Sequence, residues 1–235
     1  MKEEYNISVI IPVIGGDKDL ESLLNKLLSS SGNLIKEVII SVGDEQQPFC
    51  GDIPDTRIRI VSSPKGRGTQ FNRGAVVATA PILLFLHADT IIPEGGLERI
   101  VALMYNPNLA GGAFDLYIDA IGFQYRLIEK VASLRSRITR IPFGDQAIFV
   151  RRRLFEEIGG FHEIPLMEDV ELMRRIKRLG HRISFVSLSV KTSARRWLKK
   201  GILRTTLNNW KIQLLFLVGI KPERLANIYY GNKKI

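Results

Sequence analysis

Carboxylates stand at three places in this 235-residue sequence where they could bind a cation or move a proton. Asp44 and Asp89 each follow a run of apolar residues that is typical of a buried strand, and Glu168 and Asp169 stand at the start of a helical pattern. Carboxylate oxygens are the ligands that hard divalent cations prefer. A carboxylate at a loop–helix junction can also act as a general base. Two structural roles stay open: Asp89 as the cap of a turn, and the acidic pair as partners of the helix dipole.

A glycine-rich basic loop, Lys65–Thr69, precedes a helix that is predicted to end near Ala80. The loop lacks the P-loop pattern, and no third glycine completes a dinucleotide-binding fingerprint. It remains a flexible cationic turn at a helix N-terminus, which suits phosphate or another anion. A plain solvated turn is an equally good interpretation.

The elements that must position these residues alternate between strands and helices. Short apolar or alternating runs predict strands over residues 7–11, 37–42, 57–61 and 82–86. Leucines at helical spacing predict a helix over residues 20–28. This order is typical of a doubly wound, nucleotide-binding α/β half, in which ligands bind beyond the carboxyl ends of the strands. The topology therefore predicts that Asp44, the Lys65–Thr69 loop and Asp89 converge.

The second half of the chain continues with the same two kinds of element. Helices are predicted over residues 94–105, 123–138 and 168–179, and strands over 110–118, 147–150 and 182–190. Residues 142–146 are interpreted as a turn, and Arg151–Arg153 as a solvated helix start.

The formal charge of +10 is concentrated at one end of the chain. Residues 1–190 hold 23 basic and 23 acidic residues, whereas residues 191–235 hold 11 basic residues and the single Glu223. Trp197, Trp210 and several leucines of this segment recur on roughly one helical face. A basic amphipathic helix with tryptophans indicates an element that lies in a membrane surface, and a helix packed on the domain with its basic face in water is the alternative.

Composition places the chain among globular proteins, with 45% hydrophobic and 25% charged residues. The single cysteine, Cys50, excludes an internal disulfide and favours a reducing cytoplasm. The charged start of the chain is unlike a signal peptide, and no apolar stretch is long enough to span a bilayer. We therefore expect a cytoplasmic protein, placed at the inner face of the membrane if the basic segment binds lipid.

Five short motifs, in this order, make the chain resemble family-2 glycosyltransferases of the GT-A fold, and more narrowly a group of small, single-domain bacterial members. The motifs are Ser8–Pro12, Gly66–Ala75, Leu84–Thr90, Phe143–Arg152 and Met167–Leu172. The resemblance covers residues 7 to about 190. It implies a Rossmann-related α/β fold with a mainly parallel central sheet, in which residues 1–92 form the donor half and 93–190 the acceptor half of one catalytic domain. Residues 191–235 then form a basic, helical C-terminal extension.

The resemblance also implies roles for individual residues. Asp89 matches the position that binds Mg²⁺ or Mn²⁺ at the donor diphosphate, and Asp169 matches the catalytic base, with Glu168 beside it. Donor-binding positions are Pro12, Asp44, Gly66, Arg67, Asn72 and His87. Asp145 and Gln146 match the part of the site that contacts the sugar or the acceptor.

Two departures from the family pattern affect recognition of the donor. His87 stands where many members carry the first aspartate of the metal motif, and imidazole is a poorer ligand for a hard cation. We therefore expect His87 to contact the nucleotide or to pack. The second strand ends in Gly43-Asp44-Glu45 instead of the common Asp-Asp-Gly-Ser, which leaves the nucleoside undefined.

The resulting hypothesis is an inverting transfer of a sugar from a nucleotide-sugar donor, expected to be UDP-linked, to a hydroxyl of a lipid-linked or otherwise anionic acceptor. A nucleotidyltransferase that acts on sugar phosphates would share the acidic residues and the α/β half. A non-catalytic protein that binds a membrane surface would use only the basic segment. Nucleic-acid binding is disfavoured, because the excess charge is confined to residues 191–235 and no known nucleic-acid module is recognisable.

Overall fold

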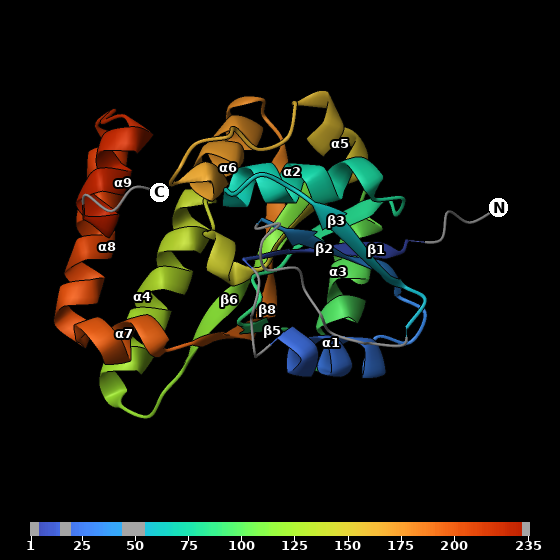
Figure 1. Cartoon of the computed structure of the whole chain (residues 1–235), viewed down its shortest axis with the longest axis horizontal. Coiled ribbons are helices and arrows are strands. Elements are labelled where there is room, and N and C mark those ends of the chain that lie inside the picture. Colours follow the sequence, from blue (N-terminus) through green and yellow to red (C-terminus); the bar gives the residue numbers. More distant parts are fainter. Residues whose placement is uncertain (1–4, 15–19, 44–54, 232–235) are drawn as a thin grey trace.

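The computed structural model describes residues 5–14, 20–43 and 55–231. It is a mixed α/β fold around one eight-stranded sheet of order β3-β2-β1-β4-β7-β6-β8-β5 (Figure 1). The strands are β1 (Ile7–Val13), β2 (Ile35–Val42), β3 (Ile58–Ser62), β4 (Ile82–Phe85), β5 (Thr90–Ile91), β6 (Leu109–Asp119), β7 (Ile148–Arg151) and β8 (Arg182–Ser193). The helices are α1 (Leu20–Ser29), α2 (Arg67–Val77), α3 (Gly96–Met104), α4 (Phe123–Thr139), α5 (Arg152–Glu157), α6 (Glu168–Arg178), α7 (Arg195–Lys200), α8 (Ile202–Leu217) and α9 (Pro222–Tyr230).

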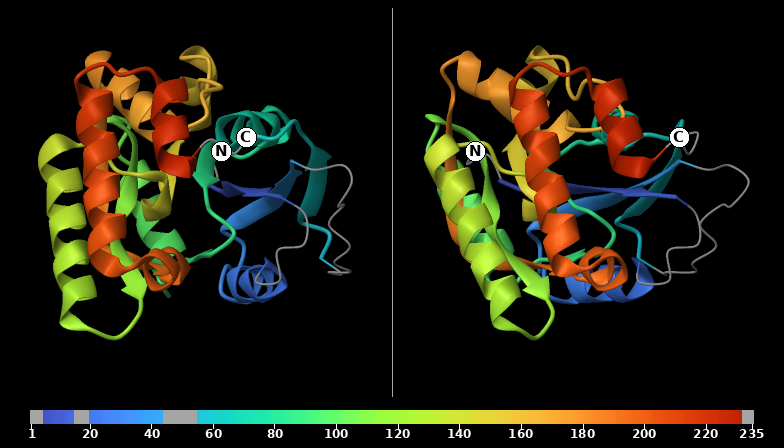
Figure 2. Two further views of the ribbon diagram at one scale, coloured as in Figure 1. Left: turned by 60° about the vertical axis from the view of Figure 1, so that its left-hand side comes forward. Right: turned by 90° about the vertical axis from the view of Figure 1, so that its left-hand side faces the viewer.

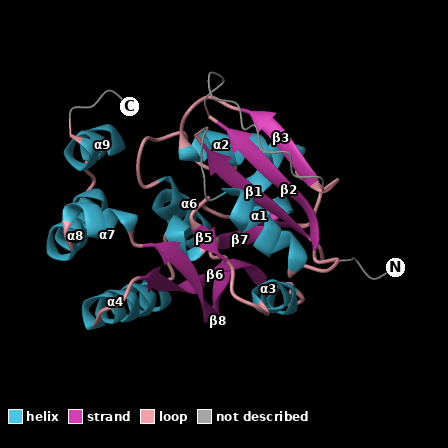
Figure 3. Cartoon of the chain, turned by 60° about the horizontal axis from the view of Figure 1, so that its bottom comes forward, coloured by secondary structure: helices cyan, strands magenta, loops and turns pink. Residues whose placement is uncertain are grey.

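The first half of the sheet is parallel, as the sequence predicts. β1 pairs with β2 and β4 in parallel, and β2 pairs with β3 in the same way. β7 then inserts antiparallel between β4 and β6, and β6 pairs in parallel with β8. The sheet is therefore mainly parallel, and its two halves meet at β4 and β7. Figure 3 shows β1, β2 and β3 side by side in one half and β6 and β8 in the other.

Apolar side chains cover both faces of the sheet. One cluster packs α1 and α3 against one face of β1, β2 and β4, and a second packs α2, α5 and α6 against the other face. Strands buried on both sides are expected to be continuously apolar, which explains the runs in β1, β2 and β4. Packing on both faces thus holds these strands in place, and their carboxyl ends remain available to form a site.

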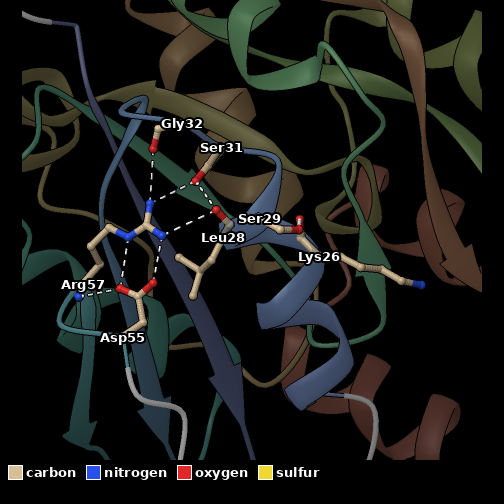
Figure 4. Close-up of polar contacts among 7 residues, drawn as sticks. All are labelled: Lys26, Leu28, Ser29, Ser31, Gly32, Asp55 and Arg57. Carbon is tan, nitrogen blue, oxygen red and sulfur yellow. Dashed lines mark hydrogen bonds and ion pairs between the residues drawn. The ribbon is translucent and has the colours of Figure 1, made fainter.

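Polar contacts hold the edge strand β3 to the turn after α1. Arg57 forms an ion pair of 2.8 Å with Asp55, and its guanidinium also donates to Ser31 Oγ and to the carbonyl oxygens of Gly32 and Leu28 (Figure 4). One arginine therefore satisfies carbonyl groups at the end of α1 that have no partner within the helix.

Gln70 ties α2 to the carboxyl ends of two strands. Its buried amide donates to the carbonyl oxygens of Val13 in β1 and Ser41 in β2, at 2.8 and 2.7 Å. Because both bonds are buried, α2 is held at the edge of the sheet where ligands bind in α/β folds.

The end of the chain differs from the sequence prediction. β8 continues to Ser193 and pairs with β5 through Lys191 and Thr192, so the expected boundary at residue 190 falls inside a strand. The predicted helical C-terminal extension is confirmed, but it consists of three helices, because Gly201 and residues 218–221 divide the segment into α7, α8 and α9. Trp197 of α7 is buried (8% exposed), whereas Trp210 of α8 is 51% exposed.

Candidate active site

A cavity of about 480 Å³ lies beyond the carboxyl ends of β4 and β8. One wall comes from the segment after β4, the short 3₁₀ helix Gly144–Gln146 and the start of α6. The opposite wall comes from α7, α8 and α9. Three carboxylates, those of Asp89, Asp145 and Asp169, face this space. The predicted convergence is confirmed for Arg67 and Asp89, which both line the cavity, whereas Asp44 lies outside the described residues.

The carboxylate of Asp169 is held by two backbone N–H groups. Gly144 N donates to Oδ2 at 2.6 Å and Val170 N donates to Oδ1 at 2.7 Å. The residue lies in the first turn of α6, where the dipole of the helix also favours negative charge. Asp169 is therefore a carboxylate held in a fixed position that retains lone pairs for a proton acceptor role.

The backbone around Asp169 is constrained. Met167, directly before α6, adopts a left-handed conformation with φ of 68°, which is uncommon for a residue with a side chain. A Cβ atom added to Gly144 would lie 2.9 Å from His87 Nε2 and 3.2 Å from Asp169 Oδ2. A larger residue at this position would therefore have to displace His87 or press on Asp169.

Glu168 points away from the cavity and holds Arg67. Its carboxylate is 2% exposed and pairs with the guanidinium through Arg67 Nε at 2.8 Å and Nη2 at 3.2 Å. Burial raises the pKa of Glu168 and Arg67 opposes that rise. Glu168 therefore positions Arg67, the first residue of α2, at the edge of the cavity.

One carboxylate oxygen of Asp145 lacks a hydrogen-bond partner among the described residues. This oxygen, Oδ1, is buried. Burial raises the pKa of Asp145 to about 6, and the nearby Asp169 adds to this effect while Arg135 opposes it. A buried carboxylate oxygen without a partner indicates a position where a ligand or cation completes the contacts.

Replacing Asp145 by asparagine is expected to stabilise the fold at neutral pH. The pKa of about 6 exceeds the model-peptide value of 3.8, so the folded protein holds the proton more tightly and its unfolding free energy falls as pH rises from about 4 to 6. Asp145→Asn removes this cost and should raise the free energy of unfolding by about 1–3 kcal/mol at pH 7. Urea unfolding at pH 7 and pH 4 measures this increase, which should vanish at the lower pH. Asp119→Asn, an exposed carboxylate outside the cavity, is the control. An equal or lower stability of Asp145→Asn at pH 7 would contradict the burial cost.

His87 remains neutral in this environment. Its pKa is lowered to about 3 by burial, with the positive charges of Arg67 and Arg196 adding to the shift. Its ring stacks on Phe71, with 6.1 Å between ring centroids. A neutral imidazole that lines the cavity can donate or accept a hydrogen bond at neutral pH but contributes no charge.

Asp89 forms an ion pair with the first residue of α7. Arg195 Nη2 of α7 lies 3.5 Å from Asp89 Oδ2, and the Asp89 side chain is 34% exposed. Within the described part of the chain, no three His, Cys, Asp or Glu side chains gather closely enough to hold a metal ion by themselves. Mg²⁺ and Mn²⁺ sites that act on phosphates commonly use one or two carboxylates and complete their shell with substrate oxygens and water. Asp89 and the partnerless oxygen of Asp145 fit that kind of site.

The C-terminal helices contribute residues that the sequence analysis did not assign to the site. Arg196 donates to the hydroxyl of Tyr229, and both line the cavity. Arg135 of α4 stacks on Phe143, with 3.6 Å from its Cζ to the ring centroid, and donates to Gln213 of α8. The first contact joins α7 to α9, and the second joins α4 to α8 and to Phe143, which precedes the 3₁₀ segment. For the residues after 190, the signals in the sequence were the excess of positive charge and the recurring tryptophans and leucines, which do not say which side chains face inward.

Some predicted site residues have structural contacts and do not line the cavity. Gln146 is buried, accepting from Ser136 Oγ and donating to the carbonyl of Phe114. Asn72 exchanges two hydrogen bonds with the backbone of Phe161. Gly66 caps α2 with φ of 136°, and Pro12 lies in β1. These four residues support the site, and their contact with a ligand remains a prediction.

Comparison with known proteins gives three likenesses. The family model for glycosyl transferase family 2 matches residues 8–162. A Bacillus subtilis (strain 168) protein described as probable glycosyltransferase YdaM is 24% identical over 216 residues, covering 81% of this chain and 51% of that protein. The chain thus spans about half the length of the curated relative it matches. The structure of mannosyltransferase PcManGT from Pyrobaculum calidifontis, in complex with GDP-Man and Mn²⁺, matches with a TM-score of 0.67 at 18% identity, over 96% of this chain and 68% of that one.

Proposed function

The chain belongs to glycosyl transferase family 2, and from this membership we propose that it transfers a sugar from a nucleotide-sugar donor to the hydroxyl of an acceptor. The observation that carries the proposal is the fixed carboxylate of Asp169, which faces the same cavity as Asp89 and Asp145. The GT-A fold that the structural likeness supports is a fold of nucleotide-sugar-dependent enzymes.

The proposed reaction is a single displacement with inversion. Asp169 accepts the proton of the acceptor hydroxyl as the oxygen forms a bond to the anomeric carbon of the sugar. The bond between that carbon and the donor diphosphate breaks, and the nucleoside diphosphate leaves from the opposite face. The guanidinium of Arg67, held by Glu168, lies at the edge of the cavity and stabilises the negative charge of the leaving group.

Mg²⁺ or Mn²⁺ is the proposed cofactor, held by Asp89 and Asp145 together with the donor. When bound, it would supply positive charge next to the diphosphate. PcManGT is described in complex with GDP-Man and Mn²⁺, which makes GDP-linked donors a second class to test beside the expected UDP-linked ones.

We propose an anionic acceptor on the evidence of charge. Arg195, Arg196, Lys199 and Lys200 of α7 all line the cavity. Such a basic wall favours an acceptor that carries phosphate or carboxylate groups. In the described part of the chain, no helix is both long enough and apolar enough to cross a bilayer.

Binding of a donor is expected to raise the melting temperature in a metal-dependent way. A ligand that binds only the folded state adds about 2.7 kcal/mol at 100 times its Kd. For a chain of this size that corresponds to a rise of roughly 5–10 °C. Thermal unfolding with UDP- and GDP-sugars, with and without Mn²⁺, measures the rise.

Asp89→Asn is the matched variant for this experiment. It should abolish the part of the rise that depends on Mn²⁺, whereas Asp119→Asn, which changes an exposed carboxylate, should leave it intact. If no nucleotide sugar stabilised the chain, the proposed donor site would be refuted. If the metal-dependent rise persisted in Asp89→Asn, the role of Asp89 as a metal ligand would be refuted.

A further inference from the structure

Helix α4 exposes a row of large apolar side chains. Phe123, Leu127, Val131, Leu134 and Ile138 are between 40% and 75% exposed. Their spacing of three or four residues places them on one side of the helix. Tyr125, Glu129 and Ser136, which are buried, occupy the other side. The exposed row therefore faces away from the core.

Helix α8 repeats the arrangement. Leu203, Leu207, Trp210, Leu214 and Leu217 are between 51% and 73% exposed and recur at the same kind of spacing. Thr205 and Ile212 are buried on the opposite side. A helix that packs only on its own domain has no need of such a second apolar side.

The two helices lie side by side at one end of the molecule (Figures 1 and 2). Arg135 of α4 donates to Gln213 of α8 across their contact. The rows thus belong to neighbouring helices, and we call the ten residues together the apolar surface. Single exposed apolar residues are ordinary, but ten of them in two rows on neighbouring helices indicate a site of interaction.

The charges around the apolar surface are almost all positive. Exposed basic residues accompany it on α4, α7 and α8: Lys130, Arg137, Lys199, Lys200, Arg204 and Lys211, of which Arg137 pairs with Asp115 of β6. Within α4, α7, α8 and α9, all of which the structure describes, the only carboxylates are the buried Glu129 and the exposed Glu223. An apolar surface with a positive border complements the anionic headgroups and acyl chains of a membrane.

Charge also argues against a second copy of the chain as the occupant. Two such surfaces in contact would bring like charges together, which costs free energy. Nucleic acid would use the positive charges but would leave the leucines in water. Trp210, with an amphipathic indole, suits the boundary between headgroups and acyl chains.

We propose that the apolar surface of α4 and α8 docks the protein onto a bilayer that contains anionic lipids. The helices lie in the plane of the interface, and the lysine and arginine side chains contact the headgroups. The inference extends the membrane element expected from residues 191–235 to α4, which precedes that segment. Docking is independent of donor binding, so the two proposals can fail separately.

Vesicle co-sedimentation of the full chain tests the proposal. We expect binding to phosphatidylcholine vesicles that contain about 30% phosphatidylglycerol, weaker binding at high salt and little binding to pure phosphatidylcholine. The triple variants Leu207→Ser/Trp210→Ser/Leu214→Ser on α8 and Leu127→Ser/Leu134→Ser/Ile138→Ser on α4 should each lower the partition coefficient at least tenfold. All six side chains are exposed, so the fold should be retained.

A matched control uses exposed apolar residues elsewhere. Ile60→Ser/Val76→Ser/Tyr105→Ser changes one aromatic and two aliphatic residues of similar exposure and should bind vesicles like the unchanged chain. Binding that survives either test variant would overturn the two-helix surface. Equal binding to neutral vesicles would overturn the role of charge. A dimer that the test variants dissociate, without vesicle binding, would assign the surface to a second copy.

Discussion

Asp169→Asn is expected to slow sugar transfer by about 10²–10⁴-fold, the usual contribution of a general base. The amide is close in size to the carboxylate and its oxygen can still accept from Gly144 N or Val170 N, so the start of α6 should be retained. An amide cannot take the proton of an acceptor hydroxyl. The loss should therefore appear in kcat, measured as release of nucleoside diphosphate in the presence of acceptor.

A measurement of donor binding distinguishes a loss of catalysis from a loss of structure. Thermal stabilisation by the donor should be the same in Asp169→Asn as in the unchanged chain, because the general base contacts the acceptor. Asp115→Asn, which breaks a surface ion pair with Arg137, is the control for loss of one carboxylate. A turnover near normal in Asp169→Asn would show that the base is another group, and Asp145, with its pKa of about 6, would be the next candidate.

Glu168→Gln is expected to lower both stability and activity. Removing one partner of a buried ion pair commonly costs about 3–5 kcal/mol, because the remaining charge stays without its counter-charge. The Arg67 side chain is 37% exposed, so water compensates part of this charge and we expect roughly 2 kcal/mol. Urea unfolding measures the loss, and a reduced effect of donor on the melting temperature reports the displaced guanidinium.

The surface pair of Arg152 and Glu156 provides the control. Both side chains are exposed and lie 3.1 Å apart at one turn of spacing, so Glu156→Gln should change stability by less than about 0.5 kcal/mol. If Glu168→Gln behaved like Glu156→Gln, the buried pair would not be what fixes Arg67. Unchanged donor affinity with lowered stability would show that the pair is purely structural.

Much of the donor half could be predicted from sequence because the burial of its strands determines which residue types they contain. Strands that are covered on both faces, such as β1 and β4, must be continuously apolar. The carboxyl end of β4 then fixes where Asp89 lies. The two-residue strand β5 could not be predicted in this way, because its formation depends on pairing with β8, which is distant in sequence.

The cavity wall formed by α7, α8 and α9 could not be predicted. An amphipathic pattern shows that a helix has an apolar and a polar side, but it does not show what each side contacts. The sequence of the C-terminal segment gives the same period whether a tryptophan packs inward, like Trp197, or stays in water, like Trp210. Two glycine-containing breaks, at Gly201 and at residues 218–221, interrupt the helical period and place the two tryptophans on separate helices. The separate roles of Glu168 and Asp169 were equally hidden, because adjacent residues at a helix start point to different neighbours, here Arg67 and Gly144.

The contact between Arg196 and Tyr229 has a consequence for the synthesis of the protein. A ribosome releases the chain from its N-terminus, so the eight strands of the sheet emerge before α9 does. Tyr229 of α9 follows every strand of the sheet in the sequence, so the cavity wall that it lines forms after the sheet has emerged. A nascent chain that holds Asp89, Asp145 and Asp169 but not yet α9 therefore lacks that wall. The cavity of the described structure is complete only once α9 has packed against α7.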